Sequence, residues 1–120
     1  MKQPSLVNTK SKAFALRIVK LYRHLKARRE SVIAKQVLRS GTSVGANITE
    51  GRFAQSHADF ISKYAIALKE AAETLYWLEI LRDGEFLPAD DAFNSLYAEC
   101  EELIRLLTAS LKTAQRNNAE

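Results

Sequence analysis

Apolar residues recur every three or four positions along most of the chain, which is the spacing of one face of an α-helix. Four such segments predict helices at about 9–26, 31–52, 56–83 and 90–115. No segment alternates apolar and polar residues with β-branched enrichment, so we expect no strands. The only two prolines stand at positions 4 and 88, outside all four segments, as helices require.

Capping residues mark the ends of these helices. Asn8 is the expected N-cap of the first helix, and Ser56 with Asp59 three residues later resembles a capping box at the start of the third. Gly84 ends the third helix, and Pro88 precedes the fourth. We expect the tail, 116–120, to fray.

Each helix has a stripe of residues that should face a common core. The stripes are Phe14, Ile18, Leu21, Tyr22 and Leu25; Ile33, Val37, Gly41, Val44 and Ile48; Phe60, Tyr64, Ala67, Ala71, Leu75 and Leu78; and Phe93, Leu96, Tyr97, Cys100, Leu103, Ile104, Leu107 and Leu111. Short connections make consecutive helices antiparallel neighbours. The sequence therefore predicts one all-α domain over 1–120, an antiparallel up-down-up-down four-helix bundle.

The first and third helices are apolar on more than their core stripe. The additional residues are Leu16, Val19, Ile61, Ala65, Ala72 and Tyr76. Trp77 and Ile80 fall outside both rows of the third helix. A helix with more apolar surface than one core can cover needs a second partner. We therefore expect a homo-oligomer with the additional residues at its interface.

Charge is divided unevenly along the chain. The net charge is +4, but residues 1–52 hold twelve lysines and arginines against two acids, and residues 53–105 hold four against eleven. The cations that could meet phosphates are Lys12, Lys20, Arg23, Lys26, Arg28, Arg29, Lys35 and Arg39. Two interpretations stay open: an RNA or DNA partner, or pairing of basic and acidic helices within or between subunits. Tyr22, the nearest aromatic, faces the core and offers no stacking platform.

Three glycines interrupt the second helix. Each costs a helix about 1 kcal/mol relative to alanine, so close packing at Gly41 and Gly45, one turn apart, is the favoured reason. Asn47, Glu50 and Arg39 could cap a neighbouring helix or make a buried polar contact, with a ligand contact as the alternative. A helix-turn-helix, with its turn at 40–43, is a weaker alternative because its second helix would be short. The glycine spacing excludes a P-loop.

Catalytic chemistry has no recognisable arrangement in this sequence. His24 and His57 lack neighbours at metal-ligand spacing, and Cys100 lies on a core stripe. The carboxylates Glu70, Glu73, Glu99, Glu101 and Glu102 are interpreted as solvated helix faces. We expect no catalytic residues, no cofactor and no metal, and hence no enzyme. The start of the chain lacks the apolar core of a signal peptide, and the longest uncharged stretch has ten residues, so we expect a cytoplasmic protein with no membrane partner.

Two strings carry a family resemblance, VLRSGTSVGANITEG at 37–51 and SHADFISKYAIALKEAAETLYWLEIL at 56–81. They resemble the four-helix bundle protein family, also called the 23S rRNA intervening-sequence protein family. Its defining strings match Gly41, Gly45, Asn47, Glu50, Lys69, Glu70, Glu73, Tyr76 and Trp77. The resemblance implies an antiparallel bundle, a homopentamer with a central channel, and no known catalytic residues. A distant relative, the accessory subunit of diversity-generating retroelements, binds nucleic acid, but this is an analogy of fold.

These observations favour a non-enzymatic oligomeric bundle that binds RNA or DNA with low specificity through the basic surface of its first helix. The alternative is a structural scaffold or adaptor whose oligomer binds another protein.

Overall fold

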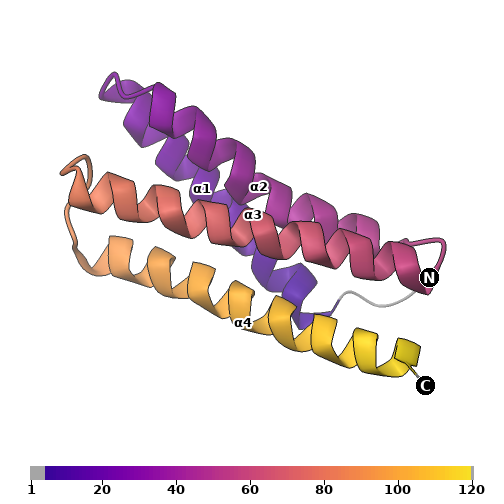
Figure 1. Cartoon of the computed structure of the whole chain (residues 1–120). Coiled ribbons are helices and arrows are strands. Elements are labelled where there is room, and N and C mark those ends of the chain that lie inside the picture. Colours follow the sequence, from indigo (N-terminus) through magenta and orange to yellow (C-terminus); the bar gives the residue numbers. More distant parts are fainter. Residues whose placement is uncertain (1–4, 120) are drawn as a thin grey trace.

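Four helices account for almost all of the molecule. The computed structural model describes the backbone of residues 5–119 and the side chains of residues 5–117. The helices are α1 (Leu6–Ala27), α2 (Val32–Arg52), α3 (His57–Asp83) and α4 (Asp91–Ala119). They form an antiparallel bundle with extents of 50 × 21 × 21 Å (Figure 1). The predicted fold class and the approximate helix positions are confirmed.

Each helix packs on its neighbour in the chain, and α4 returns to pack on α1. The pairing is tightest between α2 and α3 and sparsest between α1 and α4. The α1–α2 turn and the α3–α4 connection lie at one end of the bundle (Figure 1). The start of α1, the α2–α3 connection and the end of α4 lie at the other.

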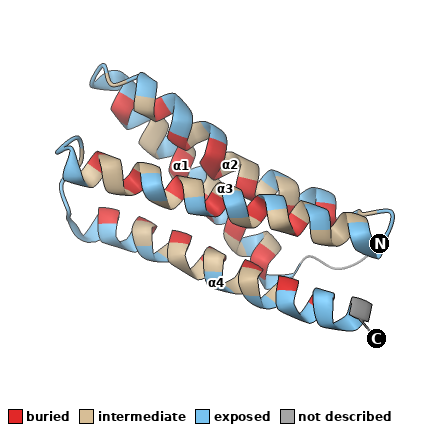
Figure 2. Ribbon diagram, in the orientation of Figure 1, coloured by how far each residue is buried: buried red, intermediate tan, exposed pale blue. Residues whose placement is uncertain are grey.

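Buried residues follow the predicted stripes, and buried and exposed positions alternate around each helix with the helical period (Figure 2). Every predicted core residue is buried or packs partly buried against the core. The core is continuous through all four helices, as a single bundle requires. Trp77, which was placed outside the apolar rows of the third helix, also packs partly buried against it.

Two helix ends differ from the prediction. The N-cap of α1 is Ser5, and Asn8 is the third helical residue, whose side chain accepts from the Ser5 N–H at 3.0 Å. A full capping box therefore begins α1 three residues earlier than expected. At the C-terminal end of the chain, α4 continues to Ala119, where fraying was predicted. His57 of α3 lies 2.8 Å from the Ala114 carbonyl oxygen, which ties the last turns of α4 to α3.

The remaining caps agree more closely with the sequence. The Ser56 hydroxyl accepts from the Asp59 N–H at 3.1 Å, as a capping box requires. The carboxylate of Asp59, however, accepts from Gln55 and not from Ser56. Asp90 caps α4 by accepting from the Phe93 N–H at 2.9 Å.

The helix-turn-helix alternative is wrong because α2 is continuous through 40–43. The Thr42 and Ser43 hydroxyls donate to the carbonyls of Leu38 and Arg39, one turn earlier in the same helix. These bonds satisfy the hydroxyls within the helix, so no turn is needed there. None of the four helices is long and apolar enough to cross a membrane within the described part of the chain.

Candidate nucleic-acid interface

The outer face of α1 carries a row of exposed cations. Lys12, Lys20, Arg23 and Lys26 all point away from the core and are exposed. At 1.5 Å of rise per residue, the row is about 21 Å long. Arg28 and Arg29 continue it into the α1–α2 turn, and Lys35 follows on α2; all three are exposed. We call these seven residues the basic α1 surface.

A different set of cations pairs with the acidic helices. Arg17 of α1 donates to Glu99 of α4 at 2.7 Å and to the Ala92 carbonyl at 3.1 Å. The Lys10 Nζ of α1 lies 3.1 Å from the Glu102 carboxylate, which also belongs to α4. Glu99 and Glu102 were expected to be solvated, but they join α4 to α1 because antiparallel packing brings the two charge patterns into register.

Arg39 was predicted with the phosphate-binding cations, but its guanidinium is engaged by α3. One nitrogen lies 2.9 Å from Glu70, and the other bonds to Glu73. Glu70 and Glu73, also interpreted as solvated, are therefore partly buried partners of α2. Trp77 donates to Glu73 as well, at 2.9 Å. We leave Arg39 out of the basic α1 surface for this reason.

The seven cations of the basic α1 surface have no such partners. Within residues 5–117, none of them has a carboxylate oxygen within 4.0 Å. Lys26 instead lies over the ring of Tyr22, 5.6 Å from its centroid. Tyr22 packs partly buried against the core, so its ring is only partly accessible.

The α1–α2 turn has a defined backbone conformation. Arg29 has a φ of 66°, in the left-handed region. The Glu30 N–H donates to the Leu25 carbonyl at 2.9 Å, and the Arg29 N–H donates to the Lys26 carbonyl at 2.9 Å. These two bonds are the Schellman motif, which closes a helix C-terminus and holds the turn in one shape.

The glycine string of α2 packs against other helices. A Cβ on Gly41 would lie 2.8 Å from Ile18 Cγ2, so only glycine fits there without a shift. A Cβ on Gly45 would lie 3.4 Å from the Ser11 carbonyl oxygen, which is tight but tolerable. Close packing at Gly41 is therefore confirmed.

The polar residues of the string do not form the contact that was expected. Asn47 donates to the Ser43 carbonyl of its own helix at 2.9 Å. Glu50 is mostly exposed and pairs with Lys63 of α3 at 3.2 Å. Arg39 and Glu50 thus both reach α3, but neither caps a neighbouring helix.

Two contacts between α3 and α2 were not predicted from the sequence. Thr74 donates to the Ser40 hydroxyl of α2 at 2.8 Å in the buried core. A Cβ on Gly51 would lie 2.7 Å from the Tyr64 ring. The small residues Ser40 and Gly51 share one face of α2, which meets α3, whereas Gly41 lies on the neighbouring face and meets α1. Two small residues on one helix face were the available signal for a close α2–α3 approach.

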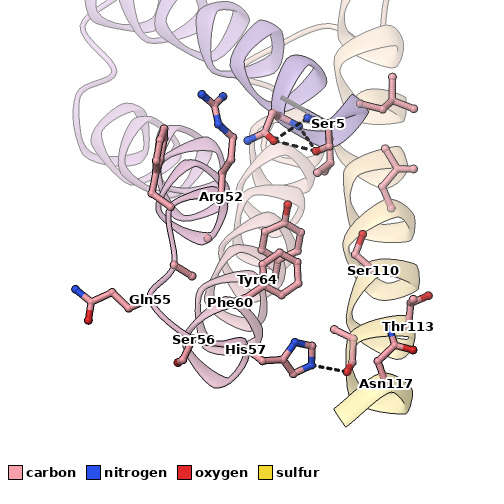
Figure 3. Close-up of a pocket in the computed structure, with 18 residues that line it drawn as sticks. Ser5, Arg52, Gln55, Ser56, His57, Phe60, Tyr64, Ser110, Thr113 and Asn117 are labelled. Atoms are coloured by element: carbon pink, nitrogen blue, oxygen red, sulfur yellow. Dashed lines mark hydrogen bonds between the residues drawn. The ribbon is translucent and has the colours of Figure 1, made fainter. Parts of the chain in front are cut away.

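A cavity of about 1050 Å³ lies at the end of the bundle opposite the α1–α2 turn (Figure 3). The Phe60 and Tyr64 rings, 4.2 Å apart between centroids, form one wall, and Ser110 and Thr113 of α4 lie across from them. Burial raises the pKa of Tyr64, and the side chain of Ser5 partly opposes this. His57 is held by α4, and no hydrogen bond joins its ring to a hydroxyl among the described residues.

Reactive groups elsewhere are separated from one another. Cys100 is buried, and burial raises the pKa of its thiol to about 12. Hence the thiolate is scarce at neutral pH. Within the described residues, no three His, Cys, Asp or Glu side chains are grouped in a way that could hold a metal ion.

Comparison with known proteins finds the family that the strings at 37–51 and 56–81 resemble. The model of the 23S rRNA-intervening sequence protein family matches residues 4–109. The chain belongs to this family. A crystal structure at 1.70 Å of a protein of unknown function of the S23 ribosomal protein family, from Bacteroides thetaiotaomicron VPI-5482, is 49% identical. It superposes with a TM-score of 0.86, covering 89% of this chain and 99% of that one. No curated protein matches the chain.

The family match includes all of α1 to α3 and more than half of α4, and so includes the basic α1 surface. The family strings contribute Glu70 and Glu73, which pair with Arg39, and Trp77, which donates to Glu73. Lys69 and Tyr76 of the same strings are exposed on α3. The 23S rRNA-intervening sequence protein strings thus include residues that join α2 to α3, Gly41, which packs on α1, and residues left on the surface.

The residues predicted to lie at an oligomer interface differ in their exposure. Leu16 is 58% exposed and Tyr76 53%, and Ala72 is also exposed. Val19 is half-buried. Ile61 and Ala65 are partly buried against the protomer's own core, so their apolar surface is already in part covered. Leu16, Ala72 and Tyr76 remain the open positions on α1 and α3.

Proposed function

We propose that this protein is a non-enzymatic binding module that contacts the phosphate backbone of RNA or DNA through the basic α1 surface. One observation carries the proposal: Lys10, Arg17 and Arg39 pair with four acids of α3 and α4, whereas none of the seven cations of the basic α1 surface has a carboxylate partner within residues 5–117. Pairing with the acidic half inside the protomer therefore does not account for these seven cations.

The chemistry of this surface suits phosphates better than bases. It holds exposed lysines and arginines, and its nearest aromatic ring, Tyr22, is partly buried against the core and has Lys26 over it. Single-strand binding relies on exposed aromatic rings, whereas phosphate contacts need only cations and carry no sequence information. We therefore propose binding that is independent of sequence, of about micromolar affinity or weaker per protomer, and stronger to duplexes than to single strands.

Reversal of three cations tests the proposal. The variant changes Lys20, Arg23 and Lys26 to Glu, and the control changes Arg105, Lys112 and Arg116 of α4, also exposed, to Glu. Both alter the net charge equally. With wild type, gel shifts at several salt concentrations should show steep salt dependence, because phosphate binding releases counterions. The α1 variant should lose binding, and the α4 variant should keep most of it.

Melting curves of both variants check that the fold is intact. Equal losses in the two variants would mean that net charge alone governs binding, and would contradict a defined surface. Wild-type protein that shifts neither duplex RNA nor duplex DNA at low salt would remove the proposal altogether.

A scaffold or adaptor role is the second candidate. The observation that favours it is the exposed apolar surface at Leu16 and Tyr76. Leu16 belongs to the basic part of the chain, and Tyr76 belongs to the acidic part. A homo-oligomer, pentameric by family resemblance, would cover these residues, and its outer faces would then bind another protein. Capture of the same protein from nuclease-treated and untreated lysate would favour this role over nucleic-acid binding.

A further inference from the structure

The residue at the left-handed position of the α1–α2 turn is unusual. Arg29 has a φ of 66° and occupies the position after the helix C-cap, where glycine predominates because it lacks a Cβ. The two Schellman hydrogen bonds, both 2.9 Å, require this backbone conformation whichever residue stands there. An arginine therefore destabilises the turn relative to glycine.

The α3–α4 connection provides an internal comparison. Glu85 also has a φ of 66° and follows the C-cap of α3. The Phe86 N–H donates to the Leu81 carbonyl at 2.9 Å, and the Glu85 N–H donates to the Arg82 carbonyl at 3.1 Å. The two turns share one backbone shape and lie at the same end of the bundle (Figure 1). They differ in the sign of the charge that they hold.

Stabilisation of the helix end does not explain the arginine. Cations near a helix C-terminus interact favourably with its dipole, but His24 and Lys26 already lie in the last turn of α1 and Arg28 is its cap. A glycine at position 29 would leave those three in place and relieve the backbone. The guanidinium of Arg29 is exposed at the tip of the basic α1 surface, next to Arg28.

We propose that Arg29 is a phosphate-contacting residue, held by the Schellman turn at the tip of the basic α1 surface, where it favours binding at the expense of stability. This rests on the proposed function. A guanidinium can donate two parallel hydrogen bonds to one phosphate, and the closed turn limits the positions from which it does so. The ligand is the phosphodiester backbone of a duplex, of either RNA or DNA.

The test compares Arg29→Gly with Glu85→Gly and Arg29→Lys. Each protein is melted, and its binding to a duplex RNA and a duplex DNA of equal length is measured at several salt concentrations. Both glycine variants should melt a few degrees higher, because each relieves a left-handed non-glycine residue. Only Arg29→Gly should bind more weakly, with a salt-dependence slope lower by about one.

The other variants isolate the cause. Glu85→Gly should not weaken binding, and Arg29→Lys, which keeps the charge and the backbone strain, should retain more affinity than Arg29→Gly. Lys112→Gln removes one exposed charge on α4, outside the basic α1 surface, and should leave the salt-dependence slope unchanged. Whether RNA or DNA is preferred follows from the two duplex arms.

Two results would overturn the inference. If wild-type protein binds and Arg29→Gly binds equally well, or no worse than Lys112→Gln, Arg29 makes no phosphate contact and only the wider surface survives. If wild-type protein binds neither duplex, the proposed function fails first and this inference fails with it.

Discussion

Gly41 is the position at which one missing atom matters most to the packing of α1 on α2. A Cβ there would lie 2.8 Å from Ile18 Cγ2 and 2.9 Å from Cγ1, and Ile18 is fully buried. A branched side chain in a filled core has little freedom to move away. The glycine thus lets the two backbones approach, which offsets its cost to the helix.

Gly41→Leu should overpack this contact and destabilise the fold by about 1–3 kcal/mol. Gly45→Ala is the matched control, because its added Cβ would meet Ser11 atoms at 3.4 Å, and its effect should be small. Urea unfolding of the two variants measures both free energies. An unchanged melting temperature for Gly41→Leu would show that the α1–α2 contact is not close in solution.

At the scale of elements, Arg39 is the main polar link between α2 and α3. Its bond to Glu73 and the bond from the Trp77 indole both lower the pKa of the Glu73 carboxyl, the arginine contributing most. A lowered pKa means that the ionised form is stabilised in the folded state. This contribution is present above the ordinary value of 4.5 and is lost as the pH falls through the folded-state pKa.

Arg39→Gln should therefore destabilise the bundle at pH 7 by about 1 kcal/mol or less, since both partners are partly solvated. The difference from wild type should shrink as the pH falls below 4.5. Trp77 is the only tryptophan, so its fluorescence reports the protonation of Glu73 directly.

Lys63→Gln provides the control for this link, because it breaks the more exposed pair with Glu50 and should have almost no effect on stability. A stability difference for Arg39→Gln that stays constant from pH 7 to pH 3 would argue against the ion pair as its source.

On the scale of the whole molecule, the two proposed uses of α1 compete for one face. Leu16 lies one turn from both Lys12 and Lys20, and Val19 lies one turn from Arg23. An interface that buries Leu16 would cover part of the cation row. Arg28 and Arg29 lie about 18 Å or more from Leu16 along the chain direction at 1.5 Å of rise per residue, so an interface centred on Leu16 would affect them least among the cations of α1 and its turn.

Assembly can be tested on α3. If exposed apolar residues form the interface, Tyr76→Asp should dissociate the oligomer and leave the protomer folded, because Tyr76 is 53% exposed in the protomer. Ile61→Asp should also dissociate it, with a loss of stability, because Ile61 packs partly against the core. Light scattering gives the mass, and circular dichroism gives the helix content.

Ala98→Asp places the same charge on the polar outer face of α4 and should leave the mass unchanged. A monomer mass for wild-type protein at micromolar concentration would remove the ring from the proposed function, and the multiplication of weak phosphate contacts that a ring provides would go with it.

The number of helices, their approximate bounds and the face that each buries could be predicted from the pattern of apolar residues. These properties are local: a helix repeats every 3.6 residues, so Phe14, Ile18 and Leu25 must share one face wherever the helix lies. The cap at Ser56 is local as well, because its hydroxyl accepts from the N–H of Asp59, three residues later. Where the sequence reasoning erred, at the start of α1, it chose Asn8 over Ser5, and both belong to one capping box.

Only the tertiary structure decided which charges meet. Arg39 reaches Glu73, and Arg17 reaches Glu99, because antiparallel helices pack in one particular register, and residues 34 and 82 positions apart in the chain become neighbours. No periodicity specifies that register. The same register leaves the basic α1 surface without carboxylate partners among the described residues, because which carboxylates come within reach depends on how the helices pack.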